Sequence, residues 1–366
     1  MVFMTWIMLF VLVVCTSIKR TNFFDDFLGL TFLSLEMFFF WMATVKLDFA
    51  YSDLIVYYAT YVQSISWNWS TFVQMHQFEF FYDIIVWIIA KIFKAFSVVL
   101  SRHDFVLIIN YIKILIIYFG IRRIKSPYFS ALVASIFLWY QYSNLFSYNL
   151  LRQGLALGFL VVVIISFSKT KNIFKYLIML IFLCFLHKSM IYLGLLSGIG
   201  VLLIYKKVIN RKWLYVGVVL GSVLYVTKSN GVLLSKLPIN FVQLYQSSDV
   251  QSMAASIGST TNDVRYLFFT LIFLCATYFI LKSAPNNLLI SVIHDYIFLI
   301  SIIYLFMGFI PFSFRIVMSA WFLFPIMLFI YIDKKFRYSF VLYFLIVIFI
   351  VIEGWAAGPF IILGGY

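Results

Sequence analysis

The sequence predicts an all-α integral membrane protein that crosses the bilayer many times. Of its 366 residues, 64% are hydrophobic and only 11% are charged, whereas soluble domains average about 25% charged residues. A membrane-spanning helix needs about 20 mostly apolar residues, and the chain contains about a dozen such windows. These observations predict a polytopic protein of about 12 transmembrane helices, with residues 1–366 forming one transmembrane domain.

The predicted helices follow the apolar runs in chain order. They cover residues 2–18, 27–45, 82–100, 104–121, 127–145, 148–167, 173–187, 190–205, 213–227, 265–282, 288–309, 315–332 and 338–353. The run 82–100 carries Lys91 and Lys94 and follows a polar, aromatic stretch, so we expect it to lie in the membrane interface or to re-enter rather than to cross. The first run lacks a basic start and a cleavage site, which predicts a retained helix. Glu36 and Lys113 lie inside two predicted spans, which allows a buried pair between them; structural pairing is favoured over a proton path.

The basic residues predict the orientation of the chain. More than half of its 27 lysines and arginines lie in six short connectors, around residues 19–20, 122–125, 169–175, 206–212, 282 and 334–337. The positive-inside rule places these connectors in the cytoplasm. The alternate connectors then lie outside, as do both chain ends. They include two long periplasmic loops, 46–81 with an amphipathic segment and 228–264 rich in small polar residues.

Polar residues gather at the external ends of the predicted helices. Asn149, Arg152 and Gln153 share one helix face, and an arginine at membrane depth costs about 2.5–3.5 kcal/mol unless it meets water or an anion. The charge count places further candidates at the same boundary: His187, Lys188, Arg265 and Arg315. One such residue alone is more typical of a membrane anchor. Several together predict a cationic cavity.

The chemistry of that cavity suits an anionic lipid. Arginine binds phosphate through two parallel hydrogen bonds and keeps its charge at any relevant pH. A pyrophosphate on a long lipid leaves its tail in the bilayer. The first loop adds carboxylates and rings typical of sugar binding, although most of these rings are equally typical of an interfacial aromatic belt. The carboxylates are Asp48, Asp53, Glu79 and Asp83, and the rings include Tyr57, Tyr58, Trp67 and Trp69.

Several motifs in a fixed order resemble one known family. They are SDLIVYY, EFFYDIIVWII, RRIKSPYF, NLLRQGLA, FLHKS and FRIVMSAWFLFPI. In this order the chain resembles the EpsG/Wzy-type polysaccharide polymerases, which include O-antigen polymerases. The resemblance covers roughly residues 40–335, and NLLRQGLA is its most specific part. Where family members often have Gly-Thr-Asp, this chain has Tyr51-Ser52-Asp53.

The resemblance implies a glycosyltransferase in the bacterial inner membrane, with its active site facing the periplasm. Such enzymes join repeat units carried on undecaprenyl pyrophosphate into long chains. The implied partners are this lipid-linked oligosaccharide, the lipid bilayer and a chain-length regulator. No cofactor or metal is implied, and the sequence contains no Asp-x-Asp, His pair or Cys cluster. The net charge of +14 reflects topology and does not predict nucleic-acid binding.

This reading predicts roles for ten residues. The pyrophosphate ligands are Arg152 and Arg315, followed by Arg265, because fixed guanidinium groups stabilise a leaving group whose charge grows. The general base is His187, ahead of Asp53 and Glu79, because a histidine titrates near neutral pH. The remaining substrate-binding candidates are Asn149, Gln153, Tyr57 and Lys188.

Three other functions remain open. A flippase or similar transporter also needs a cationic cavity, but it would be expected to show two related halves, which this sequence does not. Another lipid-carrier glycosyltransferase, such as an O-antigen ligase, would use the same chemistry. A membrane O-acyltransferase would use His187, but its donor would enter from the cytoplasm. The polysaccharide phenotype of a deletion strain distinguishes all of these.

Overall fold

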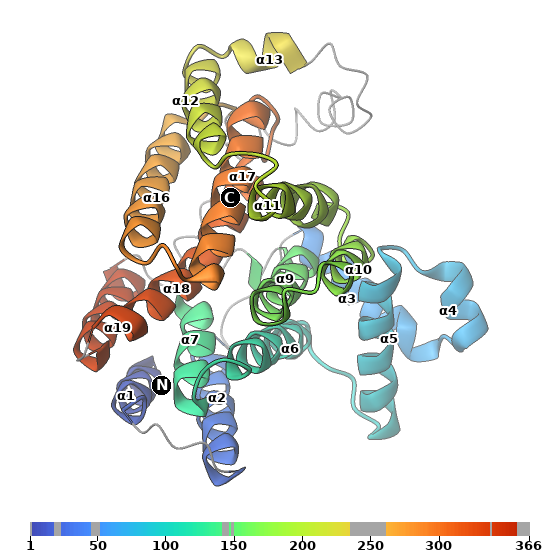
Figure 1. Cartoon of the computed structure of the whole chain (residues 1–366). Helices are drawn as coiled ribbons and strands as arrows, with labels where there is room; N and C mark the ends of the chain where they lie inside the picture. Colours follow the sequence, from blue (N-terminus) through green and yellow to red (C-terminus); the bar gives the residue numbers. More distant parts are fainter. Residues whose placement is uncertain are drawn as a thin grey trace. The chain divides into compact units, whose positions relative to one another are not determined.

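The computed structural model describes residues 2–17, 23–44, 52–140, 146–147, 150–234, 261–336 and 339–356. Every secondary-structure element within these residues is helical, which confirms the predicted all-α fold (Figure 1). They form two compact units. The first comprises Met1–Ile191 and Tyr338–Pro359, and the second comprises Tyr192–Arg337 and Phe360–Tyr366. Asn149 lies outside the described residues.

Most helices of the first unit follow the predicted runs, but two lie within the predicted loop 46–81. They are α1 (Val2–Cys15), α2 (Phe23–Thr44), α3 (Ser52–Ser66), α4 (Trp69–Met75), α5 (Phe80–Ala95), α6 (Arg102–Arg122), α7 (Pro127–Trp139), α9 (Leu151–Thr170), α10 (Ile173–Cys184) and α19 (Ser339–Ala356). Side-chain caps fix several of their starts. Ser101, Ser126 and Asn172 each accept a backbone N–H at the start of α6, α7 and α10 respectively.

The second unit contains the remaining described helices. They are the π-helical segment η1 (Ile191–Leu196), α11 (Ser197–Tyr205), α12 (Lys212–Val226), α13 (Ser229–Leu234), α16 (Val264–Ser283), α17 (Leu288–Met307) and α18 (Phe314–Lys335). Asp263 caps α16 by accepting the backbone N–H of Arg265 at 2.8 Å.

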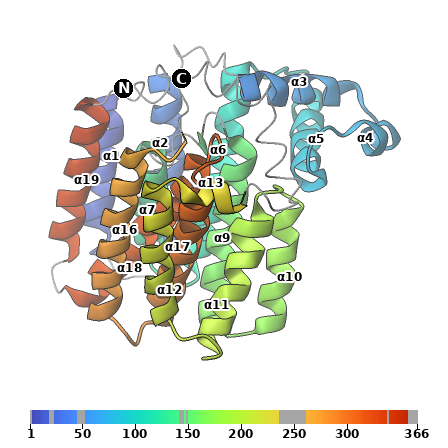
Figure 2. The same cartoon turned by 90° about the horizontal axis from the view of Figure 1, so that it is seen from above.

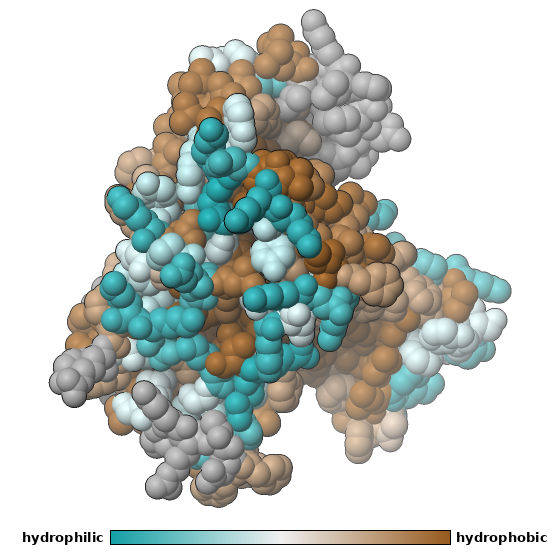
Figure 3. Space-filling view, in the orientation of Figure 1, coloured by the Kyte–Doolittle hydropathy of each residue, from teal (hydrophilic) through white to brown (hydrophobic). Residues whose placement is uncertain are grey.

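The helix lengths agree with a multi-pass membrane protein. Five described helices are long and apolar enough to cross a bilayer: α6, α9, α16, α17 and α18. Shorter apolar helices lie within several of the other predicted spans, and the count of 12 remains a prediction. On the face seen in Figure 3, hydrophilic residues gather near the middle and hydrophobic residues lie mostly toward the edges.

The first unit has a basic end, formed by the turns after α6 and α9. Arg123 Nη1 donates to Ser166 Oγ at 2.7 Å, and Lys169 Nζ donates to the carbonyl of Arg123 at 3.2 Å. Arg122 pairs with Asp26 at the start of α2. The starts of α6 and α9 and the end of α10 therefore lie at the opposite end of the unit. The charge rule predicts that this opposite end faces the periplasm.

Helix α5 has 16 residues and includes most of the predicted run 82–100, whose interfacial or re-entrant placement stays a prediction. Both Lys91 and Lys94 donate to the carbonyl of Ile65, at 3.0 and 3.1 Å. Figure 2 shows α3 and α4 running crosswise beyond the upper ends of α9 and α10, which stand upright in that view.

Two glycines allow α9 to pack closely in the first unit. A Cβ atom on Gly158 would lie 3.3 Å from Lys113 Cγ of α6, and one on Gly154 would lie 2.9 Å from Phe146 Cβ. A side chain at Gly154 would therefore collide with Phe146, whereas Gly158 leaves just enough room for a methyl group. Small residues four apart are typical of closely packed membrane helices.

The expected ion pair between Glu36 and Lys113 is wrong. Glu36 Oε1 accepts from Trp139 Nε1 at 2.9 Å, and Lys113 Nζ donates to Ser147 Oγ at 2.6 Å. Each buried group therefore has its own partner within the first unit. The indole of Trp139 contacts one oxygen of Glu36 and the hydroxyl of Ser147 contacts Lys113, partners that spacing along the sequence does not reveal.

Candidate functional site

Arg152 and Glu79 form the centre of the candidate site in the first unit. Arg152 lies in the first turn of α9 and Glu79 immediately precedes α5, 73 residues away. Arg152 Nη1 donates to Glu79 Oε2. The side chains are only 19% and 7% exposed, respectively. Arg152, the cation predicted to be costly at this helix start, is therefore neutralised by Glu79, one of the predicted carboxylates.

Two aromatic rings flank the Arg152 guanidinium. Its central carbon lies 4.2 Å from the ring centre of Phe78 and 5.1 Å from that of Tyr57. Both are within the distance at which a cation is attracted to an aromatic face. Tyr57 is buried and also packs edge-on against Phe78, at 5.2 Å between ring centres. These rings limit the motion of the guanidinium and shield it from water.

The turn after α10 supplies the third part of the site. The backbone N–H of Lys188 donates to Glu79 Oε1 at 3.0 Å, while the Lys188 side chain is exposed. Glu79 thus binds Arg152 with one oxygen and the 187–189 turn with the other. Segments that begin α5, begin α9 and follow α10 meet at one carboxylate.

These contacts determine the ionisation of Glu79. Burial raises the pKa of its carboxyl, but the Arg152 guanidinium, the nearby His187 ring and the Lys188 N–H together lower it more strongly, so that the pKa lies below its usual value. Glu79 therefore remains a carboxylate at neutral pH. A carboxylate with both oxygens engaged and a lowered pKa is a weak proton acceptor, which favours a positioning role over a general-base role.

The hydrogen bonds of His187 indicate its tautomer. The backbone N–H of Ser189 donates to His187 Nδ1 at 3.2 Å, and the Ser189 hydroxyl lies 2.6 Å from the same nitrogen. A nitrogen that accepts an N–H carries no proton, so the neutral ring carries its proton on Nε2. In this state His187 donates a hydrogen bond from Nε2 and does not accept one there.

The other predicted residues of the first unit lie around this centre. Asp53 is in the first turn of α3 and half-buried, four residues before Tyr57 on the same helix face. Gln153 is only 4% exposed and is buried in the unit.

Arg265 and Arg315 belong to the second unit. Arg265 pairs with its own helix cap, Asp263, at 2.7 Å, and its side chain is 75% exposed. The guanidinium of Arg315 lies 4.7 Å from the ring centre of Phe312. Both residues lie at the starts of their helices, and the basic connectors of this unit follow α11, α16 and α18. The convergence of both arginines with Arg152 on one cavity stays a prediction.

Sequence reasoning missed two residues of the first site. Phe78 is the ring closest to Arg152, and its backbone N–H donates to Asp83 Oδ2 at 2.7 Å. Ser189 determines the tautomer of His187. The sequences Gln-Phe-Glu and His-Lys-Ser are too common in apolar proteins to identify either role alone. Among the described residues, no group of three or more His, Cys, Asp or Glu side chains is placed to hold a metal ion.

Comparison with known proteins gives the family directly. The EpsG family model matches residues 29–357. This chain belongs to the EpsG family. The match includes every segment of the site in the first unit and both arginines of the second, and it confirms the resemblance found in the sequence motifs. Membership of the EpsG family suggests a polysaccharide polymerase-like, glycosyltransferase-like function. No curated protein and no solved structure matches this chain.

Proposed function

We propose that this EpsG-family protein is a polysaccharide polymerase that joins lipid-linked repeat units on the periplasmic face of the bacterial inner membrane. The observation that carries the proposal is the Arg152–Glu79 pair, a fixed cation at the end of the first unit opposite its basic end. The donor is the growing chain on undecaprenyl pyrophosphate, and the acceptor is a single lipid-linked unit.

The reaction is a glycosyl transfer. An acceptor hydroxyl oxygen forms a bond to the anomeric carbon of the donor sugar, and the bond from that carbon to the pyrophosphate oxygen breaks. The pyrophosphate leaves with its lipid and both bonding electrons, and the hydroxyl proton passes to a base. Negative charge grows on the leaving group, so a preorganised cation accelerates the step.

Arg152 is the residue proposed to hold the pyrophosphate. Guanidinium has five N–H donors, and only one of its nitrogens, Nη1, contacts Glu79. Its Nε is buried and has no hydrogen-bond partner in the described structure, which fits an anionic ligand. Glu79 positions the guanidinium, and the Phe78 and Tyr57 rings keep it in place.

The protonation states suggest a division of the remaining roles. His187 is proposed to donate from Nε2 to the leaving group or the sugar, since its Nδ1 is engaged by Ser189. Asp53 is then the preferred base, because Glu79 is committed to Arg152 and Lys188. Arg315 and Arg265 are proposed to complete the pyrophosphate site, and Lys188, Gln153 and Asn149 to contact the sugar units.

The test is the surface polysaccharide of a deletion strain complemented with wild type, Arg152→Ala or Arg152→Lys. For a polymerase, deletion and Arg152→Ala leave single repeats on the lipid core while the protein still inserts. Core without any repeat would instead indicate a flippase or ligase, and normal chain length with altered acetylation would indicate an acyltransferase. Long chains in the Lys variant would contradict bidentate phosphate binding.

A second assay separates the proton acceptor from the donor. With purified protein and lipid-linked repeat units, Asp53→Asn is expected to lower turnover at least 100-fold with little change in donor binding. His187→Gln keeps a hydrogen-bond donor and is expected to retain more turnover than His187→Ala. If Asp53→Asn turns over normally while both His187 variants are inactive, His187 is the base.

A further inference from the structure

An open groove lies between helices α2 and α6 of the first unit. None of the residues that line it has a role in the proposed reaction. The volume of the groove is about 340 Å³. The middle of the groove is apolar and is lined by Met37, Phe38, Leu107 and Ile108. Two polar contacts bridge the helices along it. Trp41 Nε1 donates to Asp104 Oδ1 at 2.8 Å, and the Ser34 and Tyr111 hydroxyls lie 2.6 Å apart.

The geometry of these bridges gives the groove a length. On each helix the bridging residues are seven positions apart, which corresponds to about 10 Å. One bridge lies near the start of α6, at the end of the unit opposite the basic end, and the other lies deeper along the helix. The groove therefore runs along the helices, from the predicted periplasmic boundary into the depth of the membrane.

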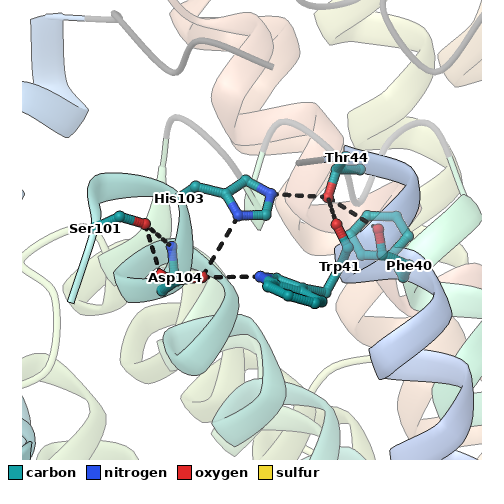
Figure 4. Close-up of polar contacts among 6 residues, drawn as sticks. All are labelled: Phe40, Trp41, Thr44, Ser101, His103 and Asp104. Carbon is teal, nitrogen blue, oxygen red and sulfur yellow. Dashed lines mark hydrogen bonds and ion pairs between the residues drawn. The ribbon is translucent and has the colours of Figure 1, made fainter. Parts of the chain in front are cut away.

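At the groove rim, near the start of α6, the polar side chains form hydrogen bonds with one another and with neighbouring backbone groups (Figure 4). Asp104 Oδ2 accepts from the Ser101 hydroxyl at 2.7 Å, and the nearest His103 nitrogen lies 3.7 Å from Asp104 Oδ1. The Thr44 hydroxyl donates to the carbonyl of Phe40 at 2.9 Å, so the 3.1 Å contact between His103 Nε2 and Thr44 Oγ1 is donated by the histidine. A carboxylate with these partners is a poor site for a phosphate.

The groove opens toward the surroundings of the helices. The Phe38 side chain is 48% exposed, whereas Leu107 on the opposite wall is 4% exposed. At this depth of a membrane-spanning helix such as α6, the only abundant partner for an apolar surface is a hydrocarbon chain. An open and mostly apolar groove of this length can hold a hydrocarbon chain that lies along it.

Helix α3 connects this groove to the Arg152 site. The Tyr58 hydroxyl donates to the carbonyl of Leu100 at 2.8 Å, and the guanidinium of Arg102 lies 5.9 Å from the Tyr58 ring centre. The adjacent residue, Tyr57, contacts Arg152. Neighbouring faces of one helix therefore contact the groove rim and the proposed pyrophosphate ligand.

We propose that the α2–α6 groove holds the hydrocarbon tail of the lipid carrier whose pyrophosphate lies at Arg152. The inference rests on the proposed function for its head group, and it adds a separate site for the tail. An ordinary phospholipid in this groove would bring its phosphate to the Asp104 rim, which provides a carboxylate. A carrier bound at Arg152 places its phosphates on the other side of α3 and leaves only the chain in the groove.

The test is photocrosslinking in vesicles of phosphatidylethanolamine and phosphatidylglycerol. A benzophenone amino acid replaces Phe38 in the groove or, as a matched control, Leu35. Leu35 is on the same helix and 40% exposed, but it does not line the groove. We expect added undecaprenyl pyrophosphate to crosslink at position 38 and to displace phospholipid there at least tenfold more effectively than at position 35. Equal crosslinking of the carrier at the two positions would overturn the proposal.

Two further arms separate the tail from the head group. Farnesyl pyrophosphate has the same head group and a much shorter tail, and we expect it to compete at least tenfold less well for position 38. Equal competition would overturn a contribution from the groove. Ile108→Trp fills the groove, and we expect it to weaken carrier binding several-fold without affecting farnesyl pyrophosphate. Leu35→Trp is its control, and equal losses in the two variants would contradict the proposal.

These binding measurements do not depend on polymerisation. If the wild-type strain makes long chains but position 38 does not bind the carrier, the tail site is wrong and the proposed function stands. If the carrier crosslinks at position 38 while the deletion strain still makes long chains, the tail site stands and the polymerase proposal is wrong.

Discussion

Glu79 is the residue on which the candidate site depends most. It holds a guanidinium with one oxygen and a backbone N–H with the other, while only 7% of its side chain is exposed. Removing one partner of a buried pair costs about 3–5 kcal/mol, because the other charge remains buried. An exposed pair contributes about 1 kcal/mol or less. The chain contains both kinds of pair.

We expect Glu79→Gln to lower the free energy of unfolding by about 3 kcal/mol, toward the lower bound for a buried pair because Arg152 retains some exposure. The matched control is Asp263→Asn, whose partner Arg265 is 75% exposed and whose amide can still cap α16; we expect a loss below about 1 kcal/mol. Denaturant titration in mild detergent measures both. Similar losses in the two variants would contradict a buried role for Glu79.

The Glu79 pair also predicts a pH dependence. An unfolded glutamate titrates near about pH 4.3, and the folded pKa of Glu79 is lower. The stabilisation is therefore complete above the unfolded pKa and is lost as the pH falls through the folded pKa. We expect the difference in Tm between wild type and Glu79→Gln to be constant from pH 7 to about pH 5 and to shrink below about pH 4. A difference that grows on acidification would contradict a lowered pKa.

At the scale of the element, the sequence located the helices better than it located their contacts. Apolar runs predicted each long helix to within several residues, because burial in hydrocarbon imposes a uniform composition on about 20 residues. The first loop was harder. Its polar, aromatic sequence contains α3 and α4, where the sequence indicated only an amphipathic segment; the Asn68 side chain caps α4 by accepting the N–H of Thr71 at 2.8 Å.

Close packing of α9 gives a prediction at this scale. We expect Gly154→Ala to destabilise the protein by about 1–3 kcal/mol, because its Cβ would lie 2.9 Å from Phe146 Cβ and the cost of overpacking applies. In Gly158→Ala the tightest contact of the new Cβ is the flexible Lys113 side chain at 3.3 Å, and the Lys113 carbonyl oxygen at 3.4 Å is at an ordinary contact distance. This substitution gains about 1 kcal/mol of helix propensity and is expected to be nearly neutral. Unfolding in detergent measures both, and equal effects would show that α9 does not approach Phe146 as closely as described.

At the scale of the whole molecule, composition predicted a multi-pass membrane protein, and the ordered sequence motifs predicted its family. They could not predict which polar groups meet. Glu79, Arg152 and Lys188 are brought together from segments 73 and 109 residues from Glu79, and no local periodicity encodes such pairing. The same limit explains the wrong pairing of Glu36 with Lys113, since two charges inside spans can each find a neutral partner.

Orientation in the membrane is testable on the complete chain. The three cysteines, Cys15, Cys184 and Cys275, are free and can be replaced by serine. In that background, we expect Met75→Cys, on the exposed helix α4, to react with a membrane-impermeant maleimide added to intact spheroplasts. We expect Lys171→Cys to react only after permeabilisation. The reverse pattern would invert the predicted orientation and place the Arg152 site in the cytoplasm.

The meeting of three segments at Glu79 has a consequence for biogenesis. The chain is synthesised from its N-terminus, so Glu79 emerges first, Arg152 follows 73 residues later, and the Lys188 N–H completes the node 109 residues after the carboxylate. Until the turn after α10 has reached its place, the Glu79 carboxylate lacks its hydrogen bond from the Lys188 N–H. The Arg152 guanidinium that it binds is then held by an incomplete set of contacts. The end of the first unit that carries the candidate site is therefore assembled late, by the arrival of a single turn. A chain truncated before residue 188 would contain every long helix of this region without a finished site.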